Sequence, residues 1–187
     1  MAAPASSTRR EEIIRVASGL LRERGLNVSL QDIADQLGTT YNALYHHFKS
    51  RDDLILHCLL RASSLLDDAM REAIEAGGSG LDQVLSFLRN VVASSLRERT
   101  PSGRLIIALS DDAQRVLGDA AAPLAANLTR LIEQGISDRS IRKIDPLVTT
   151  GWILHTIYWW PHELDADRPM EVAAETIIDL IQRALAA

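Results

Sequence analysis

Hydrogen-bonding side chains gather in one short segment near the amino terminus, from Thr39 to Lys49. Leu44 and Phe48 in this segment are four residues apart, so a helix would turn both toward a core and leave the polar side chains on its other side. Such side chains match the donors and acceptors that base pairs present in the major groove of DNA. The segment therefore predicts a helix that reads DNA bases.

The polar side of this helix holds residue types suited to different parts of a duplex. Asn42 can pair with adenine through two hydrogen bonds, and Tyr41 can contact a thymine methyl group. Lys49 and Arg51 carry positive charges that suit phosphate oxygens. The candidate DNA contacts are Thr40, Tyr41, Asn42, Tyr45, His46, Lys49 and Arg51.

The other polar residues do not form a catalytic or metal-binding pattern. His46 and His47 are adjacent, so on a helix they would point about 100° apart and would make a poor pair of metal ligands. The sequence has no histidine pair at the spacing of a metalloprotease helix, and no recognisable nucleophile beside an oriented base. We therefore expect no enzyme activity, no cofactor and no metal, with a small helical enzyme kept as an alternative.

Short helices with strong end signals must hold the reading segment in place. Ser29 and Asp32 have the spacing of a capping box, which predicts the start of a helix. Gly38 would end that helix after two turns, and Thr40 can cap a third helix that runs to about His47. Together with a first helix that ends at Gly25, this pattern predicts a helix-turn-helix.

The order of these residues resembles that of the TetR family of transcriptional regulators, across roughly residues 10–56. The single dipeptides are common, but their ordered combination is specific. The matching residues are Ile33-Ala34, Leu37-Gly38, Leu44-Tyr45, His47-Phe48, Ser50-Arg51 and Leu54.

The resemblance implies roles for individual residues and an architecture for the rest of the chain. It implies that Tyr45 and Lys49 contact phosphates, that Thr40, Tyr41 and Asn42 contact bases, and that Gln31 adds a contact from the second helix. Arg51 stands where lysine is commoner in the family, which keeps the charge but changes its geometry. The resemblance also implies a homodimer joined by the last two helices, with a ligand cavity in each subunit.

Composition and charge indicate an all-α protein with two functional parts. The 187 residues are rich in leucine and alanine, and residues 1–51 carry a net charge of +2 against −7 for the rest. We predict a disordered tail over residues 1–8, a three-helix DNA-binding domain over 9–52, and a helical ligand-binding and dimerisation domain over 53–187. A long helix from Ser50 to the glycines at 77–80 would be followed by helices at about 81–98, 102–117, 121–135, 146–160 and 169–185.

The carboxy-terminal part contains apolar stripes that suit either a pocket or an interface. Four aromatic residues, Trp152, Tyr158, Trp159 and Trp160, cluster before Pro161, and both uses stay open for them. The candidate pocket residues are His57, Phe87, Val91, Leu105, Leu109, Trp152 and Trp159. The candidate dimer residues are Leu147, Gly151, Leu154, Tyr158, Val172, Thr176, Ile177, Leu180 and Ile181.

These expectations combine into one function. We predict a homodimeric repressor that binds a palindromic double-stranded DNA operator and is released by a small hydrophobic effector. An activating or ligand-independent DNA-binding regulator is the alternative. The single cysteine, Cys58, excludes an internal disulfide, and the sequence lacks a signal peptide or membrane span, so we expect a cytoplasmic protein with no membrane partner.

Overall fold

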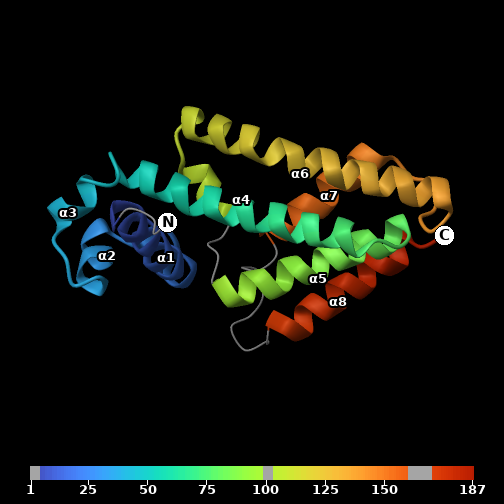
Figure 1. The fold of residues 1–187 in the computed structure, drawn as a ribbon, viewed down its shortest axis with the longest axis horizontal. Helices are drawn as coiled ribbons and strands as arrows, with labels where there is room; N and C mark the ends of the chain where they lie inside the picture. Colours follow the sequence, from blue (N-terminus) through green and yellow to red (C-terminus); the bar gives the residue numbers. More distant parts are fainter. Residues whose placement is uncertain (1–4, 99–102, 160–169) are drawn as a thin grey trace. The chain divides into compact units, whose positions relative to one another are not determined.

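A computed structural model describes residues 5–98, 103–159 and 170–187, and confirms the all-α prediction (Figure 1). No strand occurs among these residues, apart from one isolated backbone bridge between Ile141 and Ala186. Among the described helices, none has the length and hydropathy that spanning a lipid bilayer requires. The elements are α1 (Ala5–Arg24), η1 (Gly25–Asn27), α2 (Leu30–Gln36), α3 (Tyr41–Tyr45), α4 (Arg51–Ala76), α5 (Gly80–Glu98), η2 (Gly103–Ala108), α6 (Asp111–Asp138), α7 (Pro146–Trp159) and α8 (Met170–Leu185).

The chain divides into two compact units, each with its own apolar core. The N-terminal unit comprises Met1–Ser63 and Glu98–Ala120, and the C-terminal unit comprises Ser64–Arg97 and Ala121–Ala187. The N-terminal unit therefore takes more of the chain than residues 9–52. Its core includes four apolar side chains from beyond residue 100, namely Leu105, Leu109, Ala113 and Leu117.

Local end signals define the short helices of the N-terminal unit. The Ser29 hydroxyl accepts a hydrogen bond from the Asp32 amide at 3.1 Å, and the Ser29 amide donates to the Asp32 carboxylate at 2.8 Å, which completes the predicted capping box. The Ser29 hydroxyl also donates to the Asp32 carboxylate, and this bond, followed by the one from the Ser29 amide, lowers the pKa of Asp32. Gly38 has a φ of 60°, a conformation that glycine adopts at little cost, so α2 can end there.

Two helix boundaries differ from the predictions. The first helix begins at Ala5, so residues 5–8 lie in α1 instead of in a disordered tail. The predicted helices at 102–117 and 121–135 are instead the 3₁₀-helix η2 and one long helix, α6, which continues through Pro123. The three alanines before Pro123 favour helix strongly, and Ser110 caps the start of α6 by accepting a 3.4 Å bond from the Ala113 amide.

In the C-terminal unit, the start of α5 packs against the end of α6. A Cβ atom at Gly80 would lie 2.2 Å from the backbone nitrogen of Gly135, so only glycine permits this approach. Asp138 then accepts a 2.8 Å bond from the Gly80 amide, and Ser140 accepts one of 3.1 Å from the Leu81 amide. The first residue of α5 is therefore a tight packing point.

Candidate nucleic-acid interface

The helix α3 presents a polar face that is anchored from behind. Leu44 is 1% exposed and Phe48 is 3% exposed, and both lie in the core of the N-terminal unit. The amides of His47 and Phe48 each donate to the Leu44 carbonyl at 2.9 Å, which ends the helix earlier than predicted and turns Phe48 inward. Tyr41, Asn42 and Tyr45 are left exposed on the opposite side.

Phe48 is held by two contacts that its sequence spacing does not indicate. The Arg10 guanidinium lies 4.8 Å above the centre of its ring, and the His57 ring meets it edge-on at 5.7 Å. His57 is fixed in turn, because its Nδ1 lies 2.7 Å from the Asp53 carbonyl oxygen. These contacts fix the carboxy-terminal end of the reading segment.

Tyr41 and Tyr45 act as a pair on the exposed face of α3. Their hydroxyl oxygens are 2.8 Å apart and their rings meet edge-on with centres 5.0 Å apart. The hydrogen bond with Tyr41 raises the pKa of Tyr45 above its ordinary value, so Tyr45 stays neutral at physiological pH. Two hydroxyls share one internal hydrogen bond, which leaves one O–H group to donate to an external acceptor such as a phosphate oxygen.

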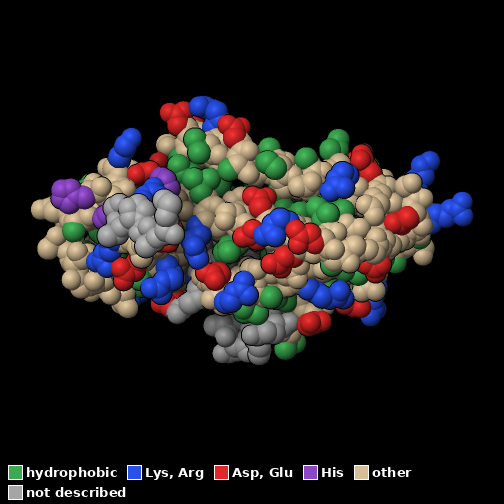
Figure 2. Space-filling view, viewed as in Figure 1, with side chains coloured by type: hydrophobic (Ala, Val, Ile, Leu, Met, Phe, Trp, Pro, Cys, Tyr) green, Lys and Arg blue, Asp and Glu red, His purple; other side chains and the backbone are tan. Residues whose placement is uncertain are grey.

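The other predicted DNA contacts differ in how free their polar groups are. The Thr40 hydroxyl accepts a 3.3 Å bond from the Ala43 amide as the cap of α3, and the Gln31 amide donates to the Asp35 carboxylate at 2.6 Å. The side chains of Asn42 and His46 are exposed, and neither has a hydrogen-bond partner among the described residues. Figure 2 shows histidine side chains at the surface in the region of α3.

Lys49 and Arg51, both predicted to bind phosphates, are placed differently. Lys49 is exposed. Arg51 is half-buried and donates from Nη2 to the carbonyl oxygen of Leu26 at 2.8 Å, and from Nε to that of Val28 at 3.2 Å. The expectation for Arg51 is therefore corrected: its guanidinium holds the loop before α2 in place. Spacing could not reveal this, because the carbonyl groups belong to a distant segment.

Replacing Arg51 by alanine should lower the free energy of unfolding by about 1–3 kcal/mol, because charged hydrogen bonds to two carbonyl groups are lost. Lysine at this position should recover part of the loss at most, since it lacks the planar fork. Urea denaturation followed by circular dichroism measures both. If Arg51→Ala instead left stability unchanged and reduced the salt slope of DNA binding by about 0.9, Arg51 would be a phosphate contact.

The described residues do not bring together three side chains that could hold a metal ion. The predicted pocket residues are also dispersed. His57, Leu105 and Leu109 belong to the N-terminal unit, where the two leucines are buried in its core. Leu105 and Leu109 are therefore corrected from pocket wall to core packing, because η2 folds onto the N-terminal helices. His57 is corrected to a partner of the Phe48 ring.

The remaining pocket candidates belong to the C-terminal unit. Phe87 is fully buried in its core, and Val91 lines a cavity. Trp152 is 46% exposed, so it faces away from the core of its own unit. The side chains of Trp159 and Trp160 lie outside the described residues.

The predicted dimer residues fall into an exposed and an inward-facing group. Ile181 is 1% exposed, and Ile177, Leu154 and Tyr158 pack against the core, so these four belong mainly to the interior of their own unit. Val148 is 70% exposed and was missed, although it follows Leu147 directly and lies about one helical turn before Trp152. The exposed set is Leu147, Val148, Gly151 and Trp152 on α7 with Val172, Thr176 and Leu180 on α8.

The sequence and the fold of this chain are similar to those of known bacterial regulators. Residues 13–58 match the family model described as bacterial regulatory proteins, tetR family. The transcriptional repressor KstR2 of Rhodococcus jostii is 28% identical over 145 residues, which cover 73% of this chain and 69% of KstR2. The structure of PfmR, a TetR family regulator from Thermus thermophilus, aligns with a TM-score of 0.78 at 24% identity over 94% of this chain and 99% of PfmR. AibR in complex with isovaleryl coenzyme A and operator DNA aligns with a TM-score of 0.76 at 18% identity, over 92% of this chain and 97% of AibR.

Proposed function

The chain belongs to the tetR family of bacterial regulatory proteins and is a DNA-binding transcriptional regulator, and from this premise we propose a homodimeric repressor that a small hydrophobic effector releases from a palindromic operator. The α3 face carries the proposal. Asn42 and the Tyr41–Tyr45 pair are exposed on one side of this helix. Leu44 and Phe48 anchor its other side in the core. A rigid helix with free hydrogen-bonding groups on one side is what reading the major groove requires.

Asn42 and Tyr45 have different parts in this proposal. Asn42 contacts a base, because its amide is exposed and can form two hydrogen bonds with adenine. Tyr45 contacts a phosphate, because the hydroxyl pair leaves one donor free. Thr40, Tyr41, His46, Lys49 and Gln31 complete the proposed surface.

Alanine variants separate these two roles in a gel-shift assay on the DNA upstream of the protein's own gene. Asn42→Ala should lose about 1–3 kcal/mol of discrimination at one base position and bind other sequences as before. Tyr45→Ala should weaken binding to all sequences alike. Gln182→Ala, an exposed change on α8, is the control and should have no effect. Equal losses on every sequence for both variants would refute base reading by Asn42, and a wild type that prefers none of the upstream DNA would refute the repressor.

The homodimer is supported by the apolar faces of α7 and α8. Leu147 and Val148 are 72% and 70% exposed, and Val172 and Leu180 are each 58% exposed. Contiguous exposed apolar side chains of this size typically mark protein–protein contacts. Two-fold association through these helices would present two reading helices to the two halves of a palindrome.

Placing a charge on α7 tests the dimer. Trp152→Glu should weaken self-association by at least about 30-fold, because a buried aromatic anchor in an interface is worth about 2 kcal/mol or more. Sedimentation velocity over a concentration series measures the change. Val116→Glu on α6 is the control, since Val116 is apolar and 49% exposed but lies in the N-terminal unit. A Trp152→Glu variant that associates as tightly as the wild type would contradict the proposal.

Binding of an effector is supported by the similar fold of AibR, whose structure was obtained with both isovaleryl coenzyme A and operator DNA. In such a regulator the ligand and the DNA must affect each other's affinity by the same factor. We propose that the effector of this chain binds in the C-terminal unit and lowers operator affinity from there.

A further inference from the structure

The C-terminal unit contains a cavity at the meeting of three helices. It lies between α5, α7 and α8, and Figure 1 shows α5 and α8 running alongside each other. Its volume, about 40 Å³, exceeds the roughly 10–15 Å³ that one water molecule needs, yet it falls well below the 150 Å³ of a cavity known to bind benzene. The lining residues are Leu88, Val91, Val92, Ser95, Thr156, Ile157, Ala174, Ile177, Ile178 and Ile181.

The lining of this cavity is almost entirely aliphatic. Eight of the ten lining residues are aliphatic, the other two are Ser95 and Thr156, and none is ionisable. The Thr156 hydroxyl donates to the Trp152 carbonyl oxygen at 2.9 Å, and its oxygen keeps lone pairs that can accept one hydrogen bond. A charged group placed here would lose its hydration and gain no counter-ion. Water would also find few partners in such a cavity.

We propose that this cavity is the effector site and that it takes a short, uncharged aliphatic group carrying at most one hydrogen-bond donor. The small volume limits the buried part to a few carbon atoms, and a single donor can reach the Thr156 oxygen. The inference rests on the proposed function, because it assumes that a ligand controls DNA binding. It places the site in a different unit from His57, Leu105 and Leu109, of which the two leucines pack in the N-terminal core.

The position of the cavity explains how a ligand there would act. The inner sides of α7 and α8 line it through Ile157 and Ile177, while their outer sides expose Leu147 and Leu180. The two helices proposed to join the subunits therefore also form the cavity wall. Filling the cavity would shift the packing of these helices, and with it the spacing of the reading helices that a palindrome requires.

Two probes of equal size but different charge test the proposal on the full-length protein. Binding of propan-1-ol and of propanoate, which are small enough for this cavity, is followed by the amide chemical shifts of α5, α7 and α8, without DNA. We expect the neutral alcohol to bind at least ten times more tightly than the anion. Equal or tighter binding of the anion, or no binding of either probe, would overturn the proposal. The experiment uses the wild-type protein, so its outcome does not depend on whether a variant folds.

A cavity-filling variant locates the binding. Ala174 lines the cavity and is 2% exposed, so Ala174→Leu should fill it and reduce alcohol affinity at least tenfold. Ala122→Leu, at an exposed position on α6, should leave it unchanged. An Ala174→Leu protein that binds the alcohol like the wild type would place the ligand elsewhere.

Operator binding gives the last readout. Saturating alcohol should weaken operator affinity of the wild type at least about fivefold and leave that of Ala174→Leu unchanged. An alcohol that binds without changing operator affinity would remove the effector role. Operator affinity without the probe tests DNA recognition separately, so failure of the cavity proposal is distinguishable from failure of the repressor proposal.

Discussion

Replacing Leu44 by alanine is expected to lower the free energy of unfolding by about 2–5 kcal/mol and to abolish operator binding. Leu44 is the side chain through which α3 packs on the N-terminal core, where it is 1% exposed. Its removal would leave a cavity under a helix of only five residues, which has little stability of its own. Thermal or urea unfolding followed by circular dichroism measures the loss, and a gel shift measures the binding.

A matched leucine provides the control for this experiment. Leu26 belongs to the same unit but is 45% exposed, so Leu26→Ala should cost less than about 1 kcal/mol and keep operator binding. Full stability in Leu44→Ala together with lost DNA binding would mean that Leu44 contacts DNA directly. The role of Leu44 as the side chain that anchors α3 on the core would then be wrong.

The local features of the reading head could be predicted because each depends on residues close together in the sequence. The capping box at Ser29, the turn at Gly38 and the cap at Thr40 each involve backbone groups within four positions. The inward side of α3 follows from Leu44 and Phe48 in the same way. Their partners, Arg10 and His57, could not be predicted, because nothing in a helical period indicates which distant side chain meets a ring.

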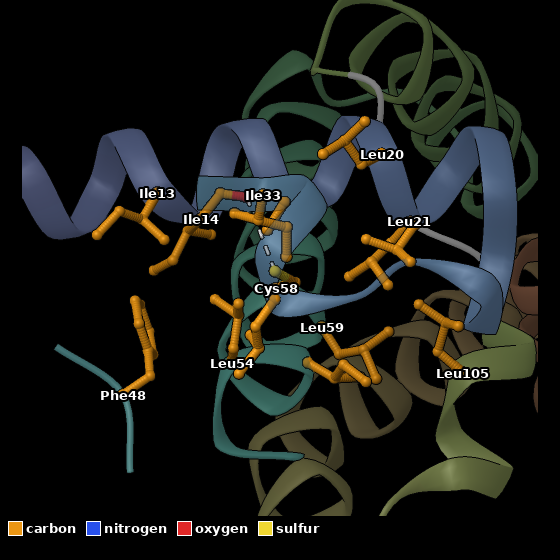
Figure 3. Packing of buried hydrophobic residues seen from close by; sticks show 14 of the residues in the cluster. Ile13, Ile14, Leu20, Leu21, Ile33, Phe48, Leu54, Cys58, Leu59 and Leu105 are labelled. Atoms are coloured by element: carbon orange, nitrogen blue, oxygen red, sulfur yellow. Dashed lines mark hydrogen bonds between the residues drawn. The ribbon is translucent and has the colours of Figure 1, made fainter. Parts of the chain in front are cut away.

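The sequence alone could not predict which of the two cores each apolar residue joins. Leu105 and Leu109 show the same helical spacing whether they line a pocket or complete the N-terminal core. The structure places both in that core, and Figure 3 shows Leu105 there. Arg51 illustrates the same limit for a polar residue, since its charge suits phosphates and backbone carbonyl groups equally well. Only long-range contacts decide between such uses.

The helices α7 and α8 are apolar on two sides, which explains the mixed outcome for the dimer residues. Periodicity marks Val172, Leu180 and Ile181 alike as apolar positions of α8. Their exposure separates them, since Ile181 turns inward to the cavity while Val172 and Leu180 face outward. A helix with two apolar sides suits a wall shared between a ligand site and a subunit contact.

Cys58 is expected to make the stability of the N-terminal unit fall with rising pH above about 9. Its thiol is fully buried and donates to the Ile14 carbonyl oxygen at 3.7 Å, as the dashed line in Figure 3 shows. Burial raises the pKa of the Cys58 thiol from 9.0 to about 11, although a hydrogen bond with Ser18 and the charge of Arg61 partly oppose the shift. The native state therefore holds the thiol proton at pH values where the unfolded state has lost it.

The sign and size of the effect follow from this difference. A raised native pKa gives stability that is complete below pH 9 and lost as the pH rises to about 11, and a shift of this size corresponds to roughly 2–3 kcal/mol. Other groups also titrate in this range, so the quantity to measure is the difference in unfolding free energy between wild type and Cys58→Ala. The wild-type advantage at pH 7 should shrink by that amount at pH 11, whereas a constant difference would show that the Cys58 thiol ionises alike in both states.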